Sequence, residues 1–325
     1  MIFVLRDETF PIAGRFTIAR GSKTEARVLY VELHDGDHIG HGESVPYARY
    51  GETIDTCAAQ LEAVRPALEA GMTLDTLQGL LPPGAARNAV DCALWDLQAK
   101  QSGVPAWKTA GLKRFEPLKT AYTLSLDTPE AMGAQAAANA RRPLLKLKIG
   151  AANDIDRVEA VRQHAPNARL IVDGNEGLSF DDLQRIAPDF AKLGVKLIEQ
   201  PMKVGEDEAL LGYDSPVALC ADESLHTRAE LDRCARLYSC VNIKLDKTGG
   251  LTEALALKDA AKARGLGIMI GCMVATSLSM APAMIIAQGA DFVDLDGPLL
   301  LARDRENGLE ITGSILAPPR PDLWG

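Results

Sequence analysis

Three carboxylate side chains stand at the ends of short apolar segments that are typical of β-strands. Asp173 ends the run RLIVD, Glu199 ends KLIE, and Asp222 follows VALCA. A lone Asp in such a place is usually a turn residue or a helix cap, so the three have to be judged together. If the segments are neighbouring parallel strands, about 4.8 Å apart, the carboxylates converge and repel one another. A hard divalent cation relieves that repulsion, and an all-oxygen set with open positions suits magnesium.

Two lysines end segments of the same kind. Lys148 ends LLKLK and Lys244 ends VNIK, while Lys146 lies two residues before Lys148 and shares its face of the strand. A Lys-x-Lys pair alone suggests a solvated edge strand, but the flanking leucines and isoleucine argue against an exposed strand here. The like charge of Lys146 would lower the pKa of Lys148, which would let Lys148 act as a base.

The segments recur with a regular spacing. Eight are found from about residue 118 on: AYTLSL, LLKLKIG, RLIVDGN, KLIEQP, VALCADES, VNIKLDK, GIMIGCM and FVDLDG. Successive segments lie 22 to 27 residues apart, which is about what a strand, a turn, a helix and a turn need. Amphipathic, Ala-rich stretches fill the seven intervals, and no clear eighth helix follows Asp296. The pattern predicts a parallel β/α barrel; a doubly wound open sheet is the alternative.

In a barrel of eight strands, Lys148 on the second and Lys244 on the sixth lie on opposite sides, and the carboxylates lie on the arc between them. One lysine can then remove a proton from one face of a substrate while the other returns a proton to the opposite face, which inverts a stereocentre. Asp294 and Asp296 share a face on the eighth strand and could bind a substrate ammonium group. Their alternatives are a second metal site or simple turn residues.

The first 115 residues predict a small α+β unit. A strand covers residues 26 to 33, an Asp-Gly turn follows, and two helical patterns come next. The second helical pattern carries one apolar stripe, made of Ala86, Val90, Ala93, Leu94 and Leu97. A polar cluster in the hairpin could pass for a metal site, but we interpret it as a solvated hairpin; its members are His34, Asp35, Asp37, His38 and His41. The domain limits drawn from these patterns are 1–115, 116–301, and a Pro-rich segment 302–325 that packs back on the first domain.

Composition narrows the class of partner. The 325 residues are 47% hydrophobic and carry a net charge of −9, which argues against nucleic acid or an anionic membrane. Six cysteines form no CxxC pair, as expected of free thiols in a reducing compartment. The short apolar N-terminus does not make a signal peptide. We therefore expect a cytoplasmic protein with a small-molecule substrate; its oligomeric state is left open, a homo-oligomer included.

Taken together, the motifs LKLKIG, VDGNEG, IEQP, CADES, NIKLDKTGG, DLDG and ALWDL resemble the enolase superfamily in its muconate-lactonizing subgroup. The match runs over nearly the whole chain. It implies an N-terminal capping domain over a (β/α)7β barrel, one Mg²⁺ per subunit on Asp173, Glu199 and Asp222, and a lysine base acting through an ene-diolate, as is established for that superfamily. VDGNEG departs from the commoner Asp-Ala-Asn run without altering Asp173.

Within the subgroup, the chain is most similar to dipeptide epimerases, in segments such as IARGSKTEARV and PYARYGE. That resemblance implies epimerisation of L-Ala-D-Glu or L-Ala-L-Glu, as from cell-wall peptide recycling. Lys148 and Lys244 would be the acid–base pair, with Lys146 auxiliary. Arg20 would bind the glutamate side chain and Asp294 with Asp296 the ammonium group. Two further residues would contact substrate, Thr123 and Met273.

Three alternatives remain at this stage. An N-succinylamino acid racemase or an o-succinylbenzoate synthase would keep the same site, but a succinylated amine carries no charge for Asp294 and Asp296 to bind. A silent barrel that binds peptide without turnover is the third. The seventh segment, GIMIGCM, has no His, which argues against the sugar-acid dehydratases of the superfamily.

Overall fold

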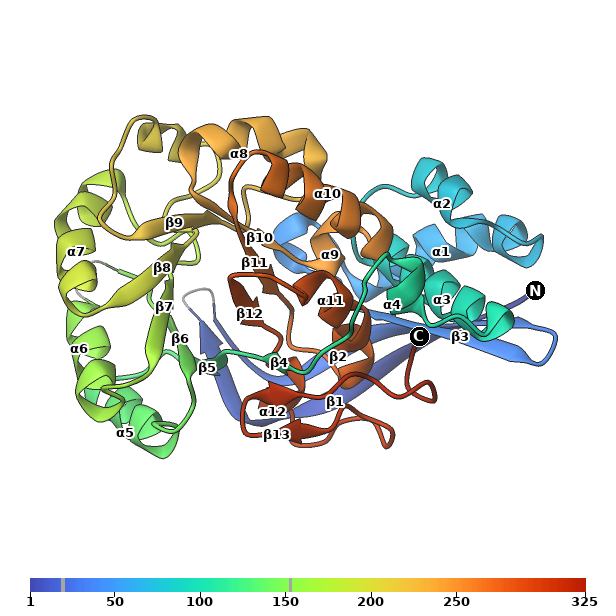
Figure 1. The fold of residues 1–325 in the computed structure, drawn as a ribbon, viewed down its shortest axis with the longest axis horizontal. Coiled ribbons are helices and arrows are strands. Elements are labelled where there is room, and N and C mark those ends of the chain that lie inside the picture. The colour runs from blue at the N-terminus through green and yellow to red at the C-terminus, as the bar shows by residue number, and fades with distance from the viewer. Residues whose placement is uncertain (19–20, 152–153) are drawn as a thin grey trace.

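The computed structural model describes residues 1–18, 21–151 and 154–325. Figure 1 shows a barrel in green to red beside an N-terminal unit in blue, with the C-terminus returning to that unit. In the described part of the chain, no helix is both long and apolar enough to cross a membrane.

The barrel has eight parallel strands in sequence order. They are β5 (Tyr122–Leu124), β6 (Leu144–Lys148), β7 (Arg169–Asp173), β8 (Val195–Glu199), β9 (Ala218–Ala221), β10 (Cys240–Ile243), β11 (Gly267–Gly271) and β12 (Phe292–Asp294). Ala121 N donates to Val293 O at 2.8 Å, which joins the first strand to the last. An unbroken order with the two ends joined excludes the doubly wound sheet, because that fold reverses its strand order at a switch point.

Helices cover the outside of the barrel. They are α5 (Pro129–Ala138), α6 (Ile155–His164), α7 (Phe180–Lys192), α8 (Leu231–Leu237), α9 (Leu245–Thr248), α10 (Leu251–Ala263), α11 (Ser277–Ala287) and α12 (Gly297–Leu300), with 3₁₀ turns η2 (Asp207–Leu210) and η3 (Arg228–Glu230). The expectation of a helix in each of the seven intervals is wrong between β8 and β9, where the chain forms only η2. Pro201, Gly205, Gly212 and Pro216 interrupt that interval, and both residue types disfavour a helix interior.

Strand alternation explains why polar side chains line the inside of the barrel at the carboxyl ends of its strands. A small apolar cluster fills the interior, formed by Ala121, Leu144, Ile171, Leu197, Cys220, Cys240 and Met269. Successive side chains of a strand point to opposite faces, so residues two further along also point inward. Two steps from Leu144 is Lys146, two from Ile171 is Asp173, and two from Leu197 is Glu199. The same two-residue period therefore sets both the apolar cluster inside the barrel and the polar site at the carboxyl ends of its strands.

The N-terminal unit, which we call the cap, pairs a three-stranded antiparallel sheet with helices. Its elements are β1 (Ile2–Ile18), β2 (Gly21–Asp35), β3 (His38–Ser44), η1 (Ala48–Tyr50), α1 (Ile54–Glu69), α2 (Leu74–Leu80), α3 (Ala85–Ser102) and α4 (Ala106–Thr109). The predicted stripe of α3 is buried. Helix α3 packs directly on β3, since a Cβ on Gly42 would come within 1.9 Å of Ala89 O. Sequence patterns predicted two helices in the first 115 residues; the structure adds two short ones, α2 and α4.

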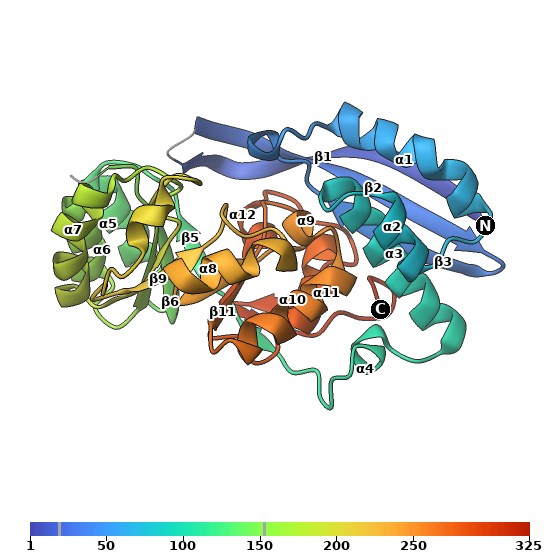
Figure 2. The ribbon, with the colours of Figure 1, turned by 90° about the horizontal axis from the view of Figure 1, so that it is seen from above.

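The long strands β1 and β2 extend from the cap across the barrel, as Figure 2 shows. Leu126 N, just after β5, donates to Thr17 O at 3.0 Å, so the ribbon reaches the open end of the barrel. In the hairpin cluster, His34 hydrogen-bonds Glu32 and His41 hydrogen-bonds Tyr30, each at 2.8 Å.

The chain returns to the cap at its C-terminal end. A small sheet joins β4 (Leu118–Lys119), β13 (Ile311–Thr312) and β14 (Ile315–Leu316). Trp324 Nε1 then donates to Cys92 O in α3 at 3.0 Å, and Gly325 N donates to Asp96 at 2.6 Å. The limits of the three domains remain a prediction.

Candidate active site

The three carboxylates lie side by side at the carboxyl ends of β7, β8 and β9. Asp173 and Glu199 are register partners across the two strands, and Asp222 follows β9 by one residue. Their exposed fractions are 0%, 0% and 1%. The convergence predicted from the sequence is therefore present, away from water.

Lys146 lies among the carboxylates. Its Nζ is 2.5 Å from Glu199 Oε2, 2.8 Å from Asp294 Oδ2 and 3.2 Å from Asp173 Oδ2. Burial alone would lower the pKa of Lys146, but Asp294, Glu199 and Asp173 together raise it well above the usual range. Lys146 is therefore a fixed cation. Its predicted effect on the pKa of Lys148 stays a prediction.

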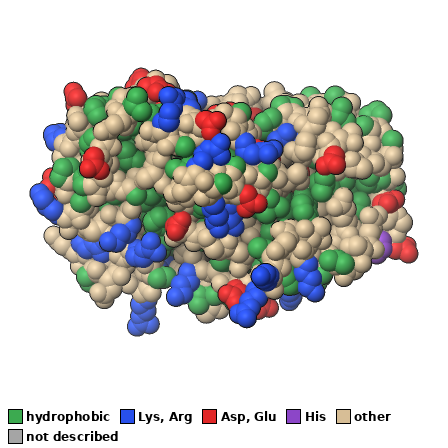
Figure 3. Space-filling view, turned by 45° about the horizontal axis from the view of Figure 1, so that its top comes forward, with side chains coloured by type: hydrophobic (Ala, Val, Ile, Leu, Met, Phe, Trp, Pro, Cys, Tyr) green, Lys and Arg blue, Asp and Glu red, His purple; other side chains and the backbone are tan. Residues whose placement is uncertain are grey.

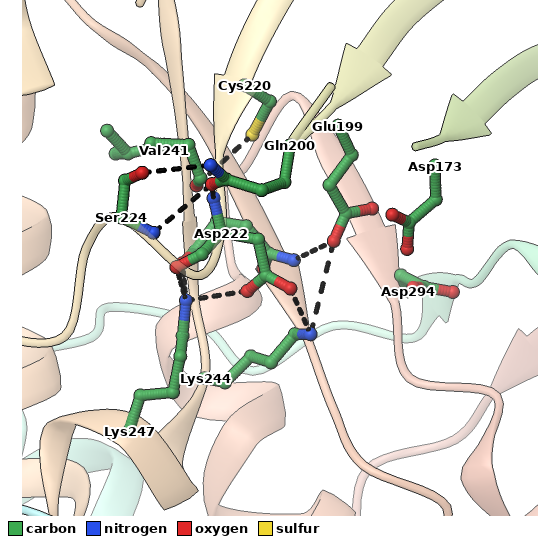
Figure 4. A network of polar contacts seen from close by, with 12 residues as sticks. Asp173, Glu199, Gln200, Cys220, Asp222, Ser224, Val241, Lys244, Lys247 and Asp294 are labelled. Atoms are coloured by element: carbon green, nitrogen blue, oxygen red, sulfur yellow. Dashed lines mark hydrogen bonds and ion pairs between the residues drawn. The ribbon is translucent and has the colours of Figure 1, made fainter. Parts of the chain in front are cut away.

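Asp173, Glu199 and Asp222 form a row of carboxylates, which we call the carboxylate row. Lys148 and Lys244 contact its opposite ends. Lys148 Nζ donates to Asp173 Oδ2 at 2.6 Å, and Lys244 Nζ donates to Asp222 Oδ2 at 2.7 Å. Figure 4 shows Lys244 between Asp222 and Glu199, with Asp173 on the far side of Glu199. The two lysines therefore flank one shared space from two sides.

Three residues that the sequence did not single out hold the row in place. Asn242 Nδ2 donates to Glu199 Oε1 at 2.7 Å. Lys247 Nζ donates to Asp222 Oδ1 at 2.6 Å and to Asn242 O at 2.9 Å. Gln200 Oε1 accepts the Asp222 N–H at 2.8 Å. For Asn242 a signal existed, because it lies two residues before Lys244 and so shares its inward face.

The row suits a divalent cation. As placed, no three His, Cys, Asp or Glu residues of the described chain enclose one point, because lysine ammonium groups lie between the carboxylates. Glu199 Oε2 is nevertheless buried, and apart from its ion pair with Lys146 it has no hydrogen-bond partner among the described residues. Burial and the neighbouring Asp173 raise the pKa of Glu199 to about 7. Such a concentration of buried negative charge, made only of oxygen donors, is what Mg²⁺ prefers.

Asp294 and Asp296, at the end of the eighth barrel strand β12, lie on the other side of the site. We call them the strand-eight pair. Asp294 accepts from Lys146, yet its Oδ1 is buried with no hydrogen-bond partner in the described residues. Asp296 Oδ2 accepts the Thr123 N–H at 2.6 Å. Burial and Asp294 raise the pKa of Asp296 to about 7. Thr123 is thus beside the pair, and its contact with substrate, implied by the family resemblance, stays a prediction.

Arg20 lies outside the described residues. Met273 is in the loop after β11, where a Cβ on Gly297 would come within 3.1 Å of Met273 O. Gly271, at the end of β11, leaves room for its neighbours: a Cβ there would lie 2.7 Å from the Asn242 amide and 2.9 Å from Lys244 Cε.

The cap approaches the loops that carry the outer carboxylates. Arg49 makes two 2.7 Å hydrogen bonds to Glu176 after β7, and the Tyr50 ring lies 4.4 Å from that of His226 after β9. A cavity of about 360 Å³ lies here, lined by Arg49, Tyr50 and His226 and by Glu52, Pro83, Gly84, Val204, Glu223 and Asp246. On the face drawn in Figure 3, basic and acidic side chains are both present and separated by neutral surface.

A capped parallel barrel with carboxylates on three successive strands and a lysine on either side defines a class of metal-assisted proton-transfer enzymes. Residues 2–111 match the mandelate racemase / muconate lactonizing enzyme N-terminal domain, and residues 130–319 match the enolase C-terminal domain-like family. The chain belongs to this family, within the enolase superfamily.

Several relatives have assigned activities. The chain is 45% identical to N-acetyl-D-glutamate racemase of Pseudoalteromonas sp. over 92% of its own length and 95% of the relative's. It is 44% identical to L-Ala-D/L-Glu epimerase of Escherichia coli K12, over 94% and 96%. A crystal structure from Agrobacterium tumefaciens, an enolase family member with homology to dipeptide epimerases, bound to sodium and L-Ala-L-Glu, is 51% identical. It covers 99% of both chains with a TM-score of 0.98.

Proposed function

We propose that this protein is an isomerase that epimerises a dipeptide at the α-carbon of its C-terminal residue, with L-Ala-D-Glu and L-Ala-L-Glu as the substrate pair. The observation that carries the proposal is the placement of Lys148 and Lys244 at opposite ends of one buried carboxylate row. A planar intermediate in the shared space would have an ammonium group on each face.

In this proposal, each lysine serves one stereoisomer. One of them removes the α-proton as a neutral amine, and the other, as an ammonium group, delivers a proton to the opposite face. In the reverse direction the roles exchange. Lys146 stays protonated and neutralises charge that develops on the substrate carboxylate.

Asp173, Glu199 and Asp222 would hold one Mg²⁺. When bound, the ion supplies electrostatic stabilisation to the negative charge that develops on the substrate carboxylate. Lys247, Asn242 and Gln200 keep the three ligands in position. The relative from Enterococcus faecalis whose structure carries Mg and L-Leu-L-Tyr, 26% identical, supports this choice of metal.

Substrate recognition would fall to the strand-eight end. The unpartnered Asp294 Oδ1 and the adjacent Asp296 offer negative charge to the ammonium group of a dipeptide, with Thr123 at their side. Arg20 would pair with the glutamate side chain, and Met273 would contact substrate through its backbone. The similarity to the E. coli L-Ala-D/L-Glu epimerase supports this assignment.

A second candidate is racemisation of an N-acylated glutamate, favoured by the 45% identity to N-acetyl-D-glutamate racemase. The same two lysines would serve that reaction. An acylated amine carries no charge, however, so Asp294 Oδ1 would stay without a partner and Asp296 without a cation, and an unpartnered buried carboxylate oxygen is costly. The dipeptide is therefore the better fit.

Proton NMR in deuterated water separates the candidates. The α-proton signal of the glutamate in L-Ala-L-Glu should disappear in the presence of Mg²⁺ and persist with a chelator. N-acetyl-D-glutamate, tested in parallel, should exchange far more slowly. Exchange of the acylated compound alone would establish the racemase, and exchange of neither would refute both.

The compartment is also a proposal. All six cysteines are free, and five are buried. Free thiols are the usual state in a reducing compartment, and we place the reaction in the cytoplasm.

A further inference from the structure

A buried carboxylate of the cap joins three distant parts of the chain. Glu43, near the end of β3, is 1% exposed. Its Oε1 accepts the Thr276 N–H at 2.8 Å, and its Oε2 accepts the Thr276 hydroxyl at 2.5 Å. Arg305, in the C-terminal segment, donates to Oε2 from Nη2 at 2.6 Å and from Nε at 3.0 Å. A carboxylate so deeply buried keeps its place only while these donors surround it.

Arg305 is itself held on several sides. Its Nη2 also donates to Glu8 at 2.8 Å. Its guanidinium lies 4.6 Å from the centre of the Tyr30 ring and 5.2 Å from that of Phe10. The cap sheet therefore holds Arg305 on several sides, and Arg305 and Thr276 together surround the Glu43 carboxylate.

Thr276 directly follows the loop that comes after β11. The loop, residues 272–275, lies on the strand-eight turn: a Cβ on Gly297 would come within 2.9 Å of Ala275 O and 3.1 Å of Met273 O. Gly297 directly follows Asp296. At the other end of the loop, Cys272 is close enough to Asp294 and Asp296 that both raise the pKa of its thiol, after burial itself.

We propose that Glu43 is a positioning residue for the ammonium subsite: by holding Thr276 it sets the loop 272–275 against Asp296, and so tunes affinity for the free amine of the substrate. The proposal rests on the proposed function, because it assigns the amine to Asp294 and Asp296. It gives the cap a part in recognising the ammonium end of the substrate.

The test compares two ligands that differ only in the amine. L-Ala-L-Glu carries it, and N-propionyl-L-glutamate lacks it. For Glu43→Gln, which keeps the shape but weakens the bonds to Arg305, KM for the dipeptide should rise about tenfold. The kcat should stay within about twofold, and the inhibition constant of N-propionyl-L-glutamate should change by less than about twofold.

Glu8→Gln is the matched control, because it removes the other carboxylate from Arg305 without touching Thr276. It should lower Tm as Glu43→Gln does and leave both ligands unaffected. Equal weakening of both ligands in Glu43→Gln, or an equal effect of Glu8→Gln on the dipeptide, would overturn the proposal. So would an unchanged KM.

Calorimetric binding of both ligands in the presence of Mg²⁺ keeps this proposal separate from the proposed function. If the wild type binds L-Ala-L-Glu but never exchanges its α-proton, the proposed function fails while the positioning role is still measured. If the wild type epimerises the dipeptide and Glu43→Gln does not discriminate between the ligands, only the positioning role fails. Glu43→Asp, which retains the charge but shortens the reach, should fall between wild type and Glu43→Gln.

Discussion

The two ends of the site differ in how many lysine ammonium groups contact their carboxylates. At the carboxylate row, Lys244 and Lys247 bind the two oxygens of Asp222, and Asn242 binds Glu199. At the strand-eight end, Asp294 Oδ1 accepts no hydrogen bond among the described residues. Asp296 accepts from one backbone N–H, that of Thr123.

In the proposed function, this difference separates proton transfer from substrate recognition. The row is preorganised by the protein itself, as electrostatic catalysis requires. The strand-eight end has unused acceptor capacity, which a cationic substrate group would fill.

The largest effect should come from removing a lysine. Lys148→Ala and Lys244→Ala should each lower epimerisation by about a thousandfold, in the range for a lost general acid or base. Each variant should still exchange the α-proton of one diastereomer in deuterated water, and the two variants should differ in which one. Loss of exchange with both diastereomers in either variant would contradict a two-base mechanism.

Asp296→Asn should have the next largest effect. It removes the charge while keeping the acceptor for Thr123, so kcat/KM for L-Ala-L-Glu should fall by about thirtyfold. The affinity for N-propionyl-L-glutamate should change little. Similar losses for the two compounds would show that the strand-eight pair does not bind the amine.

A smaller effect concerns pH. Burial and Asp294 raise the pKa of Asp296 to about 7, so the carboxylate is protonated below that pH and binds the amine poorly. KM for the dipeptide should fall about tenfold between about pH 6 and about pH 8, and Asp296→Asn should flatten that change.

The raised pKa of Asp296 affects stability in the opposite direction from substrate affinity. Because the folded pKa lies above the unfolded value, the contribution of Asp296 to stability is full at low pH and is lost as pH rises through about 7. Urea unfolding across this range should show a decrease that is smaller in Asp296→Asn, where Glu199, with its pKa also raised to about 7, still contributes. Parallel changes of stability and affinity with pH would contradict this assignment.

The smallest effect is expected from a substitution in the C-terminal segment, far from both ends of the site. Trp324→Phe removes the hydrogen bond to Cys92 O and should lower the free energy of unfolding by about 1 kcal/mol. Neither kcat nor KM should change. A change in KM would mean that the C-terminal segment influences the site in other ways than through Arg305.

Sequence periodicity predicted most of this arrangement. Strand spacing alone placed Lys148, Asp173, Glu199, Asp222 and Lys244 at one end of a barrel, because strand alternation directs them inward. The resemblance supplied alanine, glutamate and Arg20. What local patterns could not reveal were partners distant in sequence: Glu43 and Thr276 are 233 residues apart. The prediction of a helix between β8 and β9 was wrong for a local reason, because Pro and Gly interrupt the apolar residues there.

Gly271 has a consequence for how this barrel could change. Its missing side chain leaves the space in which Lys244 and Asn242 lie. A catalytic group introduced at the end of β11 would have to displace the lysine that ends β10. A side chain at 271 requires Asn242 and Lys244 to leave their present positions, so chemistry based on the seventh strand is not one substitution away from the present chain. At least two residues would have to change together, and the first change alone would disturb Lys244.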